Sequence, residues 1–138
     1  MELIEYLENN IKNPVGFIGH LPIEILTIQK GYVKALLKGS EEIANPFGTV
    51  HGGLYYAVAD TVAGTAAMTH GKYVTTSTGH IHYLNGAPAE KDLIVETVEL
   101  KAGRSLLTYE VNFYTSENIL VCKATLEYYA LREIVLED

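Results

Sequence analysis

Residues 45–53 read NPFGTVHGG and lead directly into the apolar run LYYAVADTVAGTAAM at residues 54–68. A helix that is apolar on every side must be buried on every side, so this run predicts a central helix enclosed by the rest of the chain. Gly52 and Gly53 let the backbone turn sharply and leave the first helix amides unpaired. Such amides suit an anion or a polarised carbonyl, so the start of the helix is a candidate site.

Asp60 is the only carboxylate between residues 52 and 71. A membrane span is rejected, because an aspartate in the middle of a helix costs about 2.5 to 3.5 kcal/mol on insertion scales. Two roles for Asp60 stay open. It is either a buried carboxylate satisfied by the hydroxyls of Thr61 or Thr65, or a catalytic group.

The composition indicates one domain spanning residues 1–138, since this length supports one ordinary core but not two. The formal net charge of −7 and the pI near 5.2 argue against nucleic-acid binding, which depends on Lys and Arg. Cys122 is the single cysteine and cannot form an intrachain disulfide. Because no secretory signal pattern opens the chain, we expect a soluble, cytoplasmic protein that is not bound to a membrane.

The order of local patterns predicts an α+β domain. Residues 2–10 carry apolar side chains at helical spacing, so residues 1–13 are expected to dock as a helix, with Phe17 and Ile18 packed inward after it. β-Type runs are expected at residues 23–29, 32–38, 74–84, 92–101, 104–115 and 119–131. A hairpin, a buried helix and four further antiparallel strands give a sheet that curls around the helix.

With these features the chain resembles the hotdog-fold acyl-coenzyme A thioesterases of the phenylacetic-acid-degradation type. The resemblance rests on Asn45, residues 48–53, Asp60 and the Gly-Arg-Ser sequence at residues 103–105. It covers residues 14–131 approximately. It implies the hotdog fold, in which a long central helix is wrapped by a curved antiparallel sheet of five to six strands.

The resemblance also implies hydrolysis of an acyl-coenzyme A thioester, with no metal and no cofactor. The Gly52 amide would donate to the thioester carbonyl as an oxyanion hole, and Asp60 would act as general base or as direct nucleophile. Asn45 and His51 would position the thioester and the water. Thr76 matches a hydroxyl that orients this water. The chemically equal alternatives in the same strand are Thr75, Ser77 and Thr78.

Four further residues are candidates for substrate binding. Lys101 and Arg104 flank a predicted turn, where the resembled family places basic residues that meet coenzyme A phosphates; a solvated hairpin tip is the equal alternative. Tyr56 is a candidate for an acyl pocket, although aromatic side chains are as often core. Gly53 lies beside Gly52 at the predicted helix start.

The spacing within the helix predicts an oligomer independently of the family. Gly52 and Asp60 are eight residues apart, which places them about 12 Å apart along the helix axis. One thioester carbon cannot contact both groups, so Asp60 of a second copy must approach Gly52 of the first. We expect a homodimer at least, and the resemblance implies a dimer of dimers.

Three alternatives carry less support. A non-catalytic acyl-coenzyme A binding or sensing module is the main rival, because a fold alone does not determine function. A hotdog dehydratase is disfavoured, since its Asp and His motif is missing. His80 and His82 share a strand face and could hold zinc, but no third ligand stands at recognisable spacing.

Overall fold

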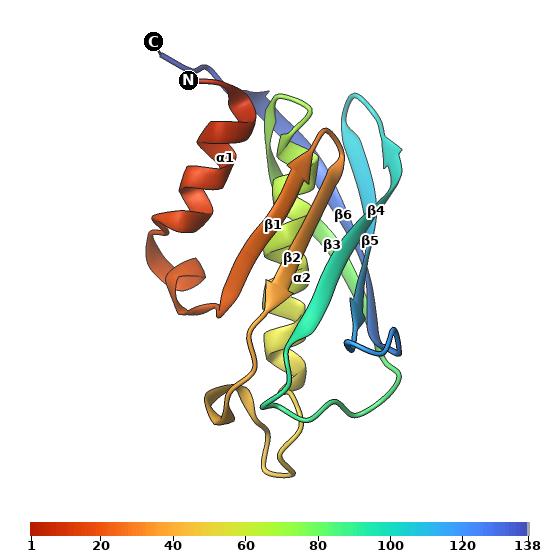
Figure 1. The fold of residues 1–138 in the computed structure, drawn as a ribbon. Helices are drawn as coiled ribbons and strands as arrows, with labels where there is room; N and C mark the ends of the chain where they lie inside the picture. Colours follow the sequence, from red (N-terminus) through yellow and green to blue (C-terminus); the bar gives the residue numbers. More distant parts are fainter. Residues whose placement is uncertain (138) are drawn as a thin grey trace.

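The computed structural model describes residues 1–137 and contains two α-helices and six strands (Figure 1). In chain order the elements are α1 (Leu3–Lys12), the 3-10 turn η1 (Gly16–His20), β1 (Ile23–Gln29), β2 (Tyr32–Leu37), the 3-10 turn η2 (Glu41–Ile43), α2 (Gly52–Met68), β3 (Lys72–Tyr83), β4 (Leu93–Ala102), β5 (Leu106–Tyr114) and β6 (Leu120–Glu133). The predicted α+β hotdog fold is therefore confirmed.

All six strands form one antiparallel sheet in the order β1-β2-β4-β5-β6-β3. Figure 1 shows this sheet curving around α2. Strands β1 and β3 are the two edges of the sheet. The β1 edge lies beside α1, whereas β3 pairs only with β6 along its 12 residues.

Helix α2 forms the centre of the core, as its all-round apolar sequence predicts. Val58, Ala59, Val62, Ala63 and Ala66 are at most 1% exposed. They pack against the inward faces of the strands, where period-two alternation buries every second side chain. The small side chains along α2 let the sheet backbone approach the helix closely.

Helix α1 docks on the domain through Leu7, which is 1% exposed. The hydroxyls of Tyr6 in α1 and Tyr73 in β3 lie 2.9 Å apart and form a hydrogen bond. One expectation for this region is wrong: Phe17 is 68% exposed and does not pack inward. Phe17 belongs to turn η1, and its side chain lines a surface cavity instead of packing against the core.

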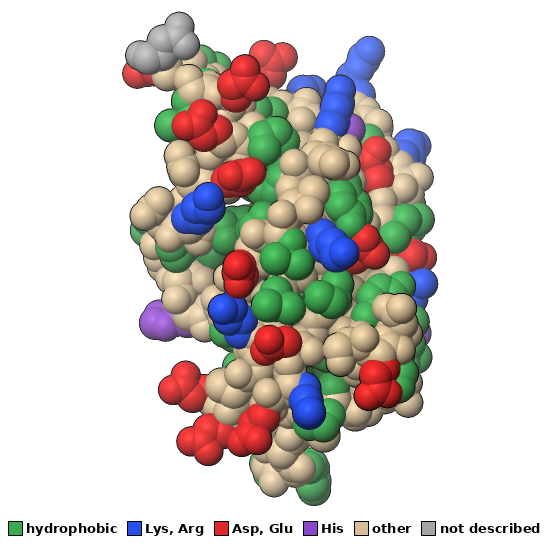
Figure 2. Space-filling view, in the orientation of Figure 1, with side chains coloured by type: hydrophobic (Ala, Val, Ile, Leu, Met, Phe, Trp, Pro, Cys, Tyr) green, Lys and Arg blue, Asp and Glu red, His purple; other side chains and the backbone are tan. Residues whose placement is uncertain are grey.

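The outer face of the sheet is partly apolar. Figure 2 shows green side chains gathered over the front strands, with charged groups among them. Leu26 of β1 and Val98 of β4 are 47% and 42% exposed on this side. Within residues 1–137, no helix combines the length and the apolar character needed to cross a membrane.

Candidate active site

The segment before α2 is a turn built on the side chain of Asn45. Its Oδ1 accepts hydrogen bonds from the amides of Phe47 and Thr49 at 2.9 and 3.1 Å, and its Nδ2 donates to the Thr49 hydroxyl at 2.7 Å. Gly48 completes the turn at φ +82°, a conformation that favours glycine. Asn45 therefore shapes the turn, and its second Nδ2 hydrogen has no partner among residues 1–137.

His51 caps the N-terminus of α2. Its Nδ1 accepts a hydrogen bond from the Gly53 amide at 2.9 Å, which places the proton of the neutral imidazole on the exposed Nε2. The Gly53 amide is thus occupied. The Gly52 amide, by contrast, has no hydrogen-bond partner in the described chain. A free amide at a helix N-terminus is the donor that the predicted oxyanion role requires.

Gly52 and Gly53 at the helix start each lie close to an aromatic ring, that of Tyr83 and that of His51 respectively. The Tyr83 hydroxyl donates to the Gly52 carbonyl oxygen at 2.9 Å, and a Cβ on Gly52 would lie 3.1 Å from the Tyr83 ring. A Cβ on Gly53 would lie 3.2 Å from the imidazole of His51. Neither glycine has a positive φ, so close contacts with these rings, and not backbone conformation, disfavour a side chain at both positions.

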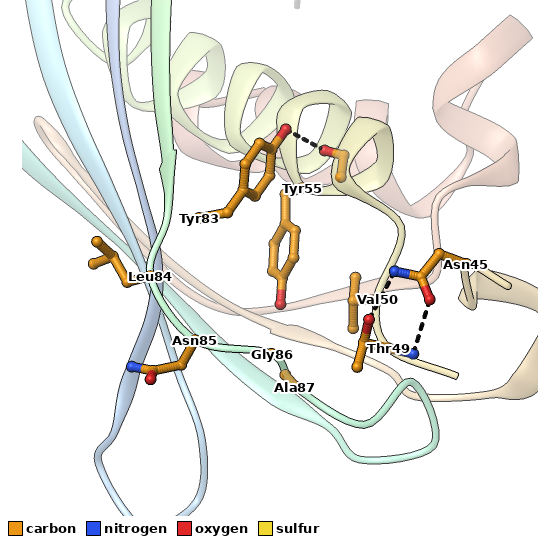
Figure 3. A pocket seen from close by; sticks show the side chains of 10 residues that line it. Asn45, Thr49, Val50, Tyr55, Tyr83, Leu84, Asn85, Gly86 and Ala87 are labelled. Atoms are coloured by element: carbon orange, nitrogen blue, oxygen red, sulfur yellow. Dashed lines mark hydrogen bonds between the residues drawn. The ribbon is translucent and has the colours of Figure 1, made fainter. Parts of the chain in front are cut away.

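A cavity of about 260 Å³, the N-terminal cavity, opens beside this turn (Figure 3). Its lining residues are Asn45, Thr49, Val50, Gly52, Tyr55, Tyr83, Leu84, Asn85, Gly86 and Ala87. The Tyr55 hydroxyl is buried without a hydrogen-bond partner in residues 1–137, and the residue is 4% exposed. Burial raises the pKa of Tyr55 to about 12, so the hydroxyl stays protonated at neutral pH. This cavity therefore holds an unused buried donor.

Asp60 projects from the middle of α2 toward β3 and β6. Its Oδ1 accepts a hydrogen bond from the Thr76 hydroxyl at 2.7 Å. The one hydrogen of the Tyr128 hydroxyl is shared between Oδ1 at 3.0 Å and the Asp60 carbonyl oxygen at 2.9 Å. Oδ2 has no hydrogen-bond partner in the part of the chain that the structure describes. The Thr61 and Thr65 hydroxyls donate to helix carbonyls instead, so neither satisfies Asp60. One oxygen is fixed and the other is free for chemistry.

A second cavity of about 370 Å³, the Asp60 cavity, opens in front of this carboxylate. Its lining residues are Leu7, Asn10, Ile11, Phe17, Ile18, Ala57, Asp60, Thr61, Gly64, Thr65, Met68, Val74, Thr76 and Tyr128. Helix α1 and turn η1 thus form one wall, and α2 and the start of β3 form another. Burial raises the pKa of Tyr128 well above its ordinary value, and the charge of Asp60 adds to this effect, so Tyr128 remains a donor.

Register explains why Thr76 is the residue that reaches Asp60. Thr76 is paired with the inward-facing Tyr128 across β3 and β6, so both hydroxyls point at α2. A bulge follows, and Thr78 is then paired with the outward-facing Glu127. Of the four candidates in the strand, Thr76 is the one that bonds to Asp60. No role in the site was predicted for Tyr128.

The other candidate binding residues lie apart from both cavities. The Tyr56 side chain crosses the β3 backbone at Gly79 and lines neither cavity. A side chain at position 79 would collide with the Tyr56 hydroxyl. Arg104 lies in a turn that spans residues 103–105, longer than expected, and lines a small hollow together with His70 and Lys72. Lys101 is exposed at the end of β4. A basic hollow therefore exists at the C-terminal end of α2, and its contact with phosphates stays a prediction.

The remaining candidates for a nucleophile or a metal ligand are Cys122, His80 and His82, and none of them lines either cavity. His80 and His82 are exposed on β3 with ring centroids 5.3 Å apart. Within residues 1–137, no group of three or more His, Cys, Asp or Glu side chains converges on a common point. Burial raises the pKa of the Cys122 thiol to about 12, as expected for a cysteine of the core.

Comparison with known proteins assigns the chain to a family. The model of the thioesterase superfamily matches residues 47–122, which is more than half of the 138 residues. The chain belongs to the thioesterase superfamily. The matched segment runs from the turn before α2 to Cys122 in β6 and includes Gly52, Asp60 and Thr76. The predicted membership in a family of hotdog thioesterases is therefore confirmed.

Individual relatives agree with this membership. A protein of Archaeoglobus fulgidus that bears a provisional name as an esterase is 28% identical over 113 residues, covering 82% of this thioesterase and 73% of the relative. Two solved structures share the fold. A hypothetical thioesterase protein of Streptococcus pneumoniae with coenzyme A has a TM-score of 0.79, 24% identity and coverage of 82% and 88%. The Escherichia coli PaaI protein of the phenylacetic acid degradation operon has a TM-score of 0.86, 17% identity and coverage of 98% and 100%.

Proposed function

We propose that this thioesterase hydrolyses acyl-coenzyme A thioesters at a site built by two copies of the chain. The observation that carries the proposal is Asp60: one carboxylate oxygen is held by two hydroxyls, and the other is free at the wall of a cavity. The same helix presents a free amide at Gly52. A fixed acceptor and a free donor are the two groups that acyl transfer to water requires.

The Gly52 amide donates to the thioester carbonyl oxygen. Negative charge grows on this oxygen as the carbonyl carbon becomes tetrahedral, so the hydrogen bond strengthens toward the transition state. In comparable hydrolases one such donor contributes about 3 to 4 kcal/mol. His51 Nε2 and the second Nδ2 hydrogen of Asn45 are further donors at this turn and position the thioester and the water.

Asp60 Oδ2 takes a proton from water while the water oxygen bonds to the carbonyl carbon. Collapse of the tetrahedral intermediate then breaks the C–S bond, and the leaving thiolate takes the proton from Asp60. The products are the free acid and coenzyme A. A direct attack by Oδ2 on the carbonyl carbon would use the same free oxygen, with water cleaving the resulting anhydride. Thr76 and Tyr128 orient the carboxylate in both routes.

The two halves of the site come from different chains. Gly52 and Asp60 lie about 12 Å apart along α2, too far for one carbonyl group to contact both. Strand β3, which carries Thr76, is an edge strand of 12 residues with no partner on its outer side in the described chain. Long unpaired edges favour pairing with another strand, and a second copy supplies one. We propose a homodimer joined at β3, and a dimer of dimers built from it.

The solved neighbours support the substrate and the carboxylate. The Streptococcus pneumoniae protein is described with coenzyme A, and a Streptococcus mutans protein of the same fold is described with acetyl coenzyme A. The former was also solved with one Asp and, separately, one Thr replaced by Ala, at positions 16 apart in its chain. Asp60 and Thr76 are also 16 residues apart.

Replacing Asp60 tests the proposal. Asp60→Asn keeps the shape of the side chain but removes its basicity, so kcat should fall by roughly 10²- to 10⁴-fold, while calorimetric binding of a non-hydrolysable coenzyme A thioether stays intact. Asp92→Asn, the same change at a loop aspartate that accepts from the Gly39 amide, is the control and should keep full activity. Turnover near the wild-type rate in Asp60→Asn would refute the assignment. Binding without hydrolysis in both proteins would favour the sensing module.

A further inference from the structure

Gly64 lies in the interior of α2, where glycine weakens a helix relative to alanine. A Cβ on Gly64 would meet the Tyr128 ring at 3.6 Å, which is ordinary van der Waals contact. Its φ is not positive either. Neither packing within the chain nor backbone conformation therefore requires glycine here. Gly64 lines the Asp60 cavity, and its lack of a side chain leaves space there.

The wall opposite Gly64 comes from α1 and η1 and is apolar except for Asn10. Leu7, Ile11, Phe17 and Ile18 line this side of the Asp60 cavity. The hydrogen bond between Tyr6 and Tyr73 ties α1 to β3, so this wall is held in place relative to the strand that carries Thr76.

The polar atoms in the Asp60 cavity are mostly occupied. The hydroxyls of Thr61 and Thr65 donate to carbonyls of α2, and those of Thr76 and Tyr128 donate to Asp60. For the amides of a pantetheine arm, Asp60 Oδ2 and the exposed side chain of Asn10 are the partners left among the described lining residues, whereas an acyl chain needs no partner. The cavity chemistry thus fits the acyl side of a thioester.

We propose that the Asp60 cavity receives the acyl group and that Gly64 sets its depth, so the preferred substrates carry apolar acyl groups larger than acetyl. This inference rests on the proposed function. The volume of about 370 Å³ is more than twice the roughly 150 Å³ of an apolar cavity that binds benzene. An aryl-acetyl group or an aliphatic chain of medium length would fit, and α1 and η1 would close over it.

The test is a comparison of kcat/KM across coenzyme A esters from acetyl to dodecanoyl, with phenylacetyl included, for the wild type and Gly64→Ala. The added methyl should lower kcat/KM at least about 10-fold for the longest acyl group that the wild type accepts well, because one methylene in an apolar pocket changes discrimination by about 10- to 200-fold. Acetyl-coenzyme A should change less than about twofold. The denaturation midpoint should rise, because alanine favours the helix.

Matched variants separate the acyl cavity from general damage. Gly19→Ala makes the same change in η1, where a Cβ would meet only Pro14 at 3.6 Å, and should leave the chain-length profile unchanged. Ile11→Trp fills the cavity from α1 and should also shift the profile toward shorter acyl groups. Glu5→Trp places the same side chain on the exposed side of α1 and should not.

Three outcomes would overturn the inference. If the wild type hydrolyses coenzyme A esters but Gly64→Ala keeps the wild-type profile, the acyl group lies elsewhere and the proposed function still stands. If Gly64→Ala loses activity equally at every chain length, Gly64 does not determine specificity. If the wild type hydrolyses none of the esters, the proposed function and this inference both fail.

Discussion

The start and the middle of α2 present opposite halves of one chemical arrangement. At the start, Gly52 offers a free amide and Tyr55 an unpaired buried hydroxyl, but no carboxylate lines the N-terminal cavity. In the middle, Asp60 offers a free oxygen, while its neighbouring hydroxyls are already committed to it. The first region can stabilise negative charge and the second can accept a proton. Neither region is a complete hydrolytic site.

This difference shows what a single chain can and cannot do. A free donor and a free acceptor on one rigid helix cannot move toward each other, because the helix fixes their separation at about 12 Å. They can meet only if two helices lie side by side in opposite directions. The separation of the donor and the acceptor along α2 is therefore an argument for a dimer that does not depend on comparison with related proteins.

Mixing two inactive variants is the strongest way to break this comparison. Asp60→Ala removes the acceptor. Asn45→Asp keeps the turn-forming Oδ1 but adds negative charge to the cavity that Gly52 also lines, so each homodimer should be inactive. In a mixed dimer, two-fold symmetry places both lesions in one site and leaves the other intact. Random pairing makes about half the dimers mixed, so about one quarter of wild-type activity should return.

The two variants should be co-expressed with different tags, because a stable dimer exchanges chains slowly. Doubly tagged dimers that remain as inactive as the parents would show that each chain builds its own site. Mixed dimers of Asp60→Ala with Asp60→Asn serve as the control, since both lesions then affect the same half and activity should not return.

A smaller effect is expected from the hydroxyls that hold Asp60. Tyr128→Phe removes a hydroxyl whose hydrogen is shared between Oδ1 and the Asp60 carbonyl oxygen. Hydrogen bonds to charged groups contribute about 1.5 to 3 kcal/mol, so kcat should fall by at most about 10- to 100-fold. The neighbouring Tyr129 is 52% exposed, and Tyr129→Phe should leave kcat unchanged. Stopped-flow detection of the released thiol measures both. An unchanged kcat in Tyr128→Phe would mean that Tyr128 is only a core residue.

The smallest effect concerns the N-terminal cavity. Tyr55→Phe removes a buried hydroxyl that has no partner in residues 1–137, so the free energy of unfolding should stay the same or rise by about 1 kcal/mol. If substrate supplies the missing partner, KM should rise severalfold while kcat changes little. Urea unfolding and steady-state kinetics test the two parts. A lower stability would show that the hydroxyl is satisfied within the folded protein.

The region that the sequence predicts best is the turn before α2. Its groups lie within nine consecutive residues, and the free amide of Gly52 follows from a local rule about helix starts. The cap formed by His51 does not, because histidine is not one of the preferred capping residues. Helix α2 itself is predicted by composition alone, since a run that is apolar all round must lie at the centre. The hairpin of β1 and β2 has its turn at the predicted position, between residues 29 and 32, with Gly31 at φ +76°.

The surroundings of Asp60 could not be predicted in the same way. Thr76 and Tyr128 come from strands 16 and 68 residues further along the chain. A single-residue bulge in β3 decides which hydroxyl faces inward, and no local pattern announces that bulge. A buried tyrosine usually has a partner for its hydroxyl, and this is the one signal that could have linked Tyr128 to a polar site.

Tyr83 connects two parts of the molecule that have so far been described separately. It is the last residue of the edge strand β3, and its hydroxyl holds the carbonyl of Gly52 in the first turn of α2. A strand that frays at an unpaired edge would release this turn, whereas a paired strand would keep it rigid. If two chains pair at β3 as proposed, dilution would weaken the enzyme in two ways, by separating the chains and by loosening the donor within each of them. The activity per milligram of protein would then rise with the protein concentration.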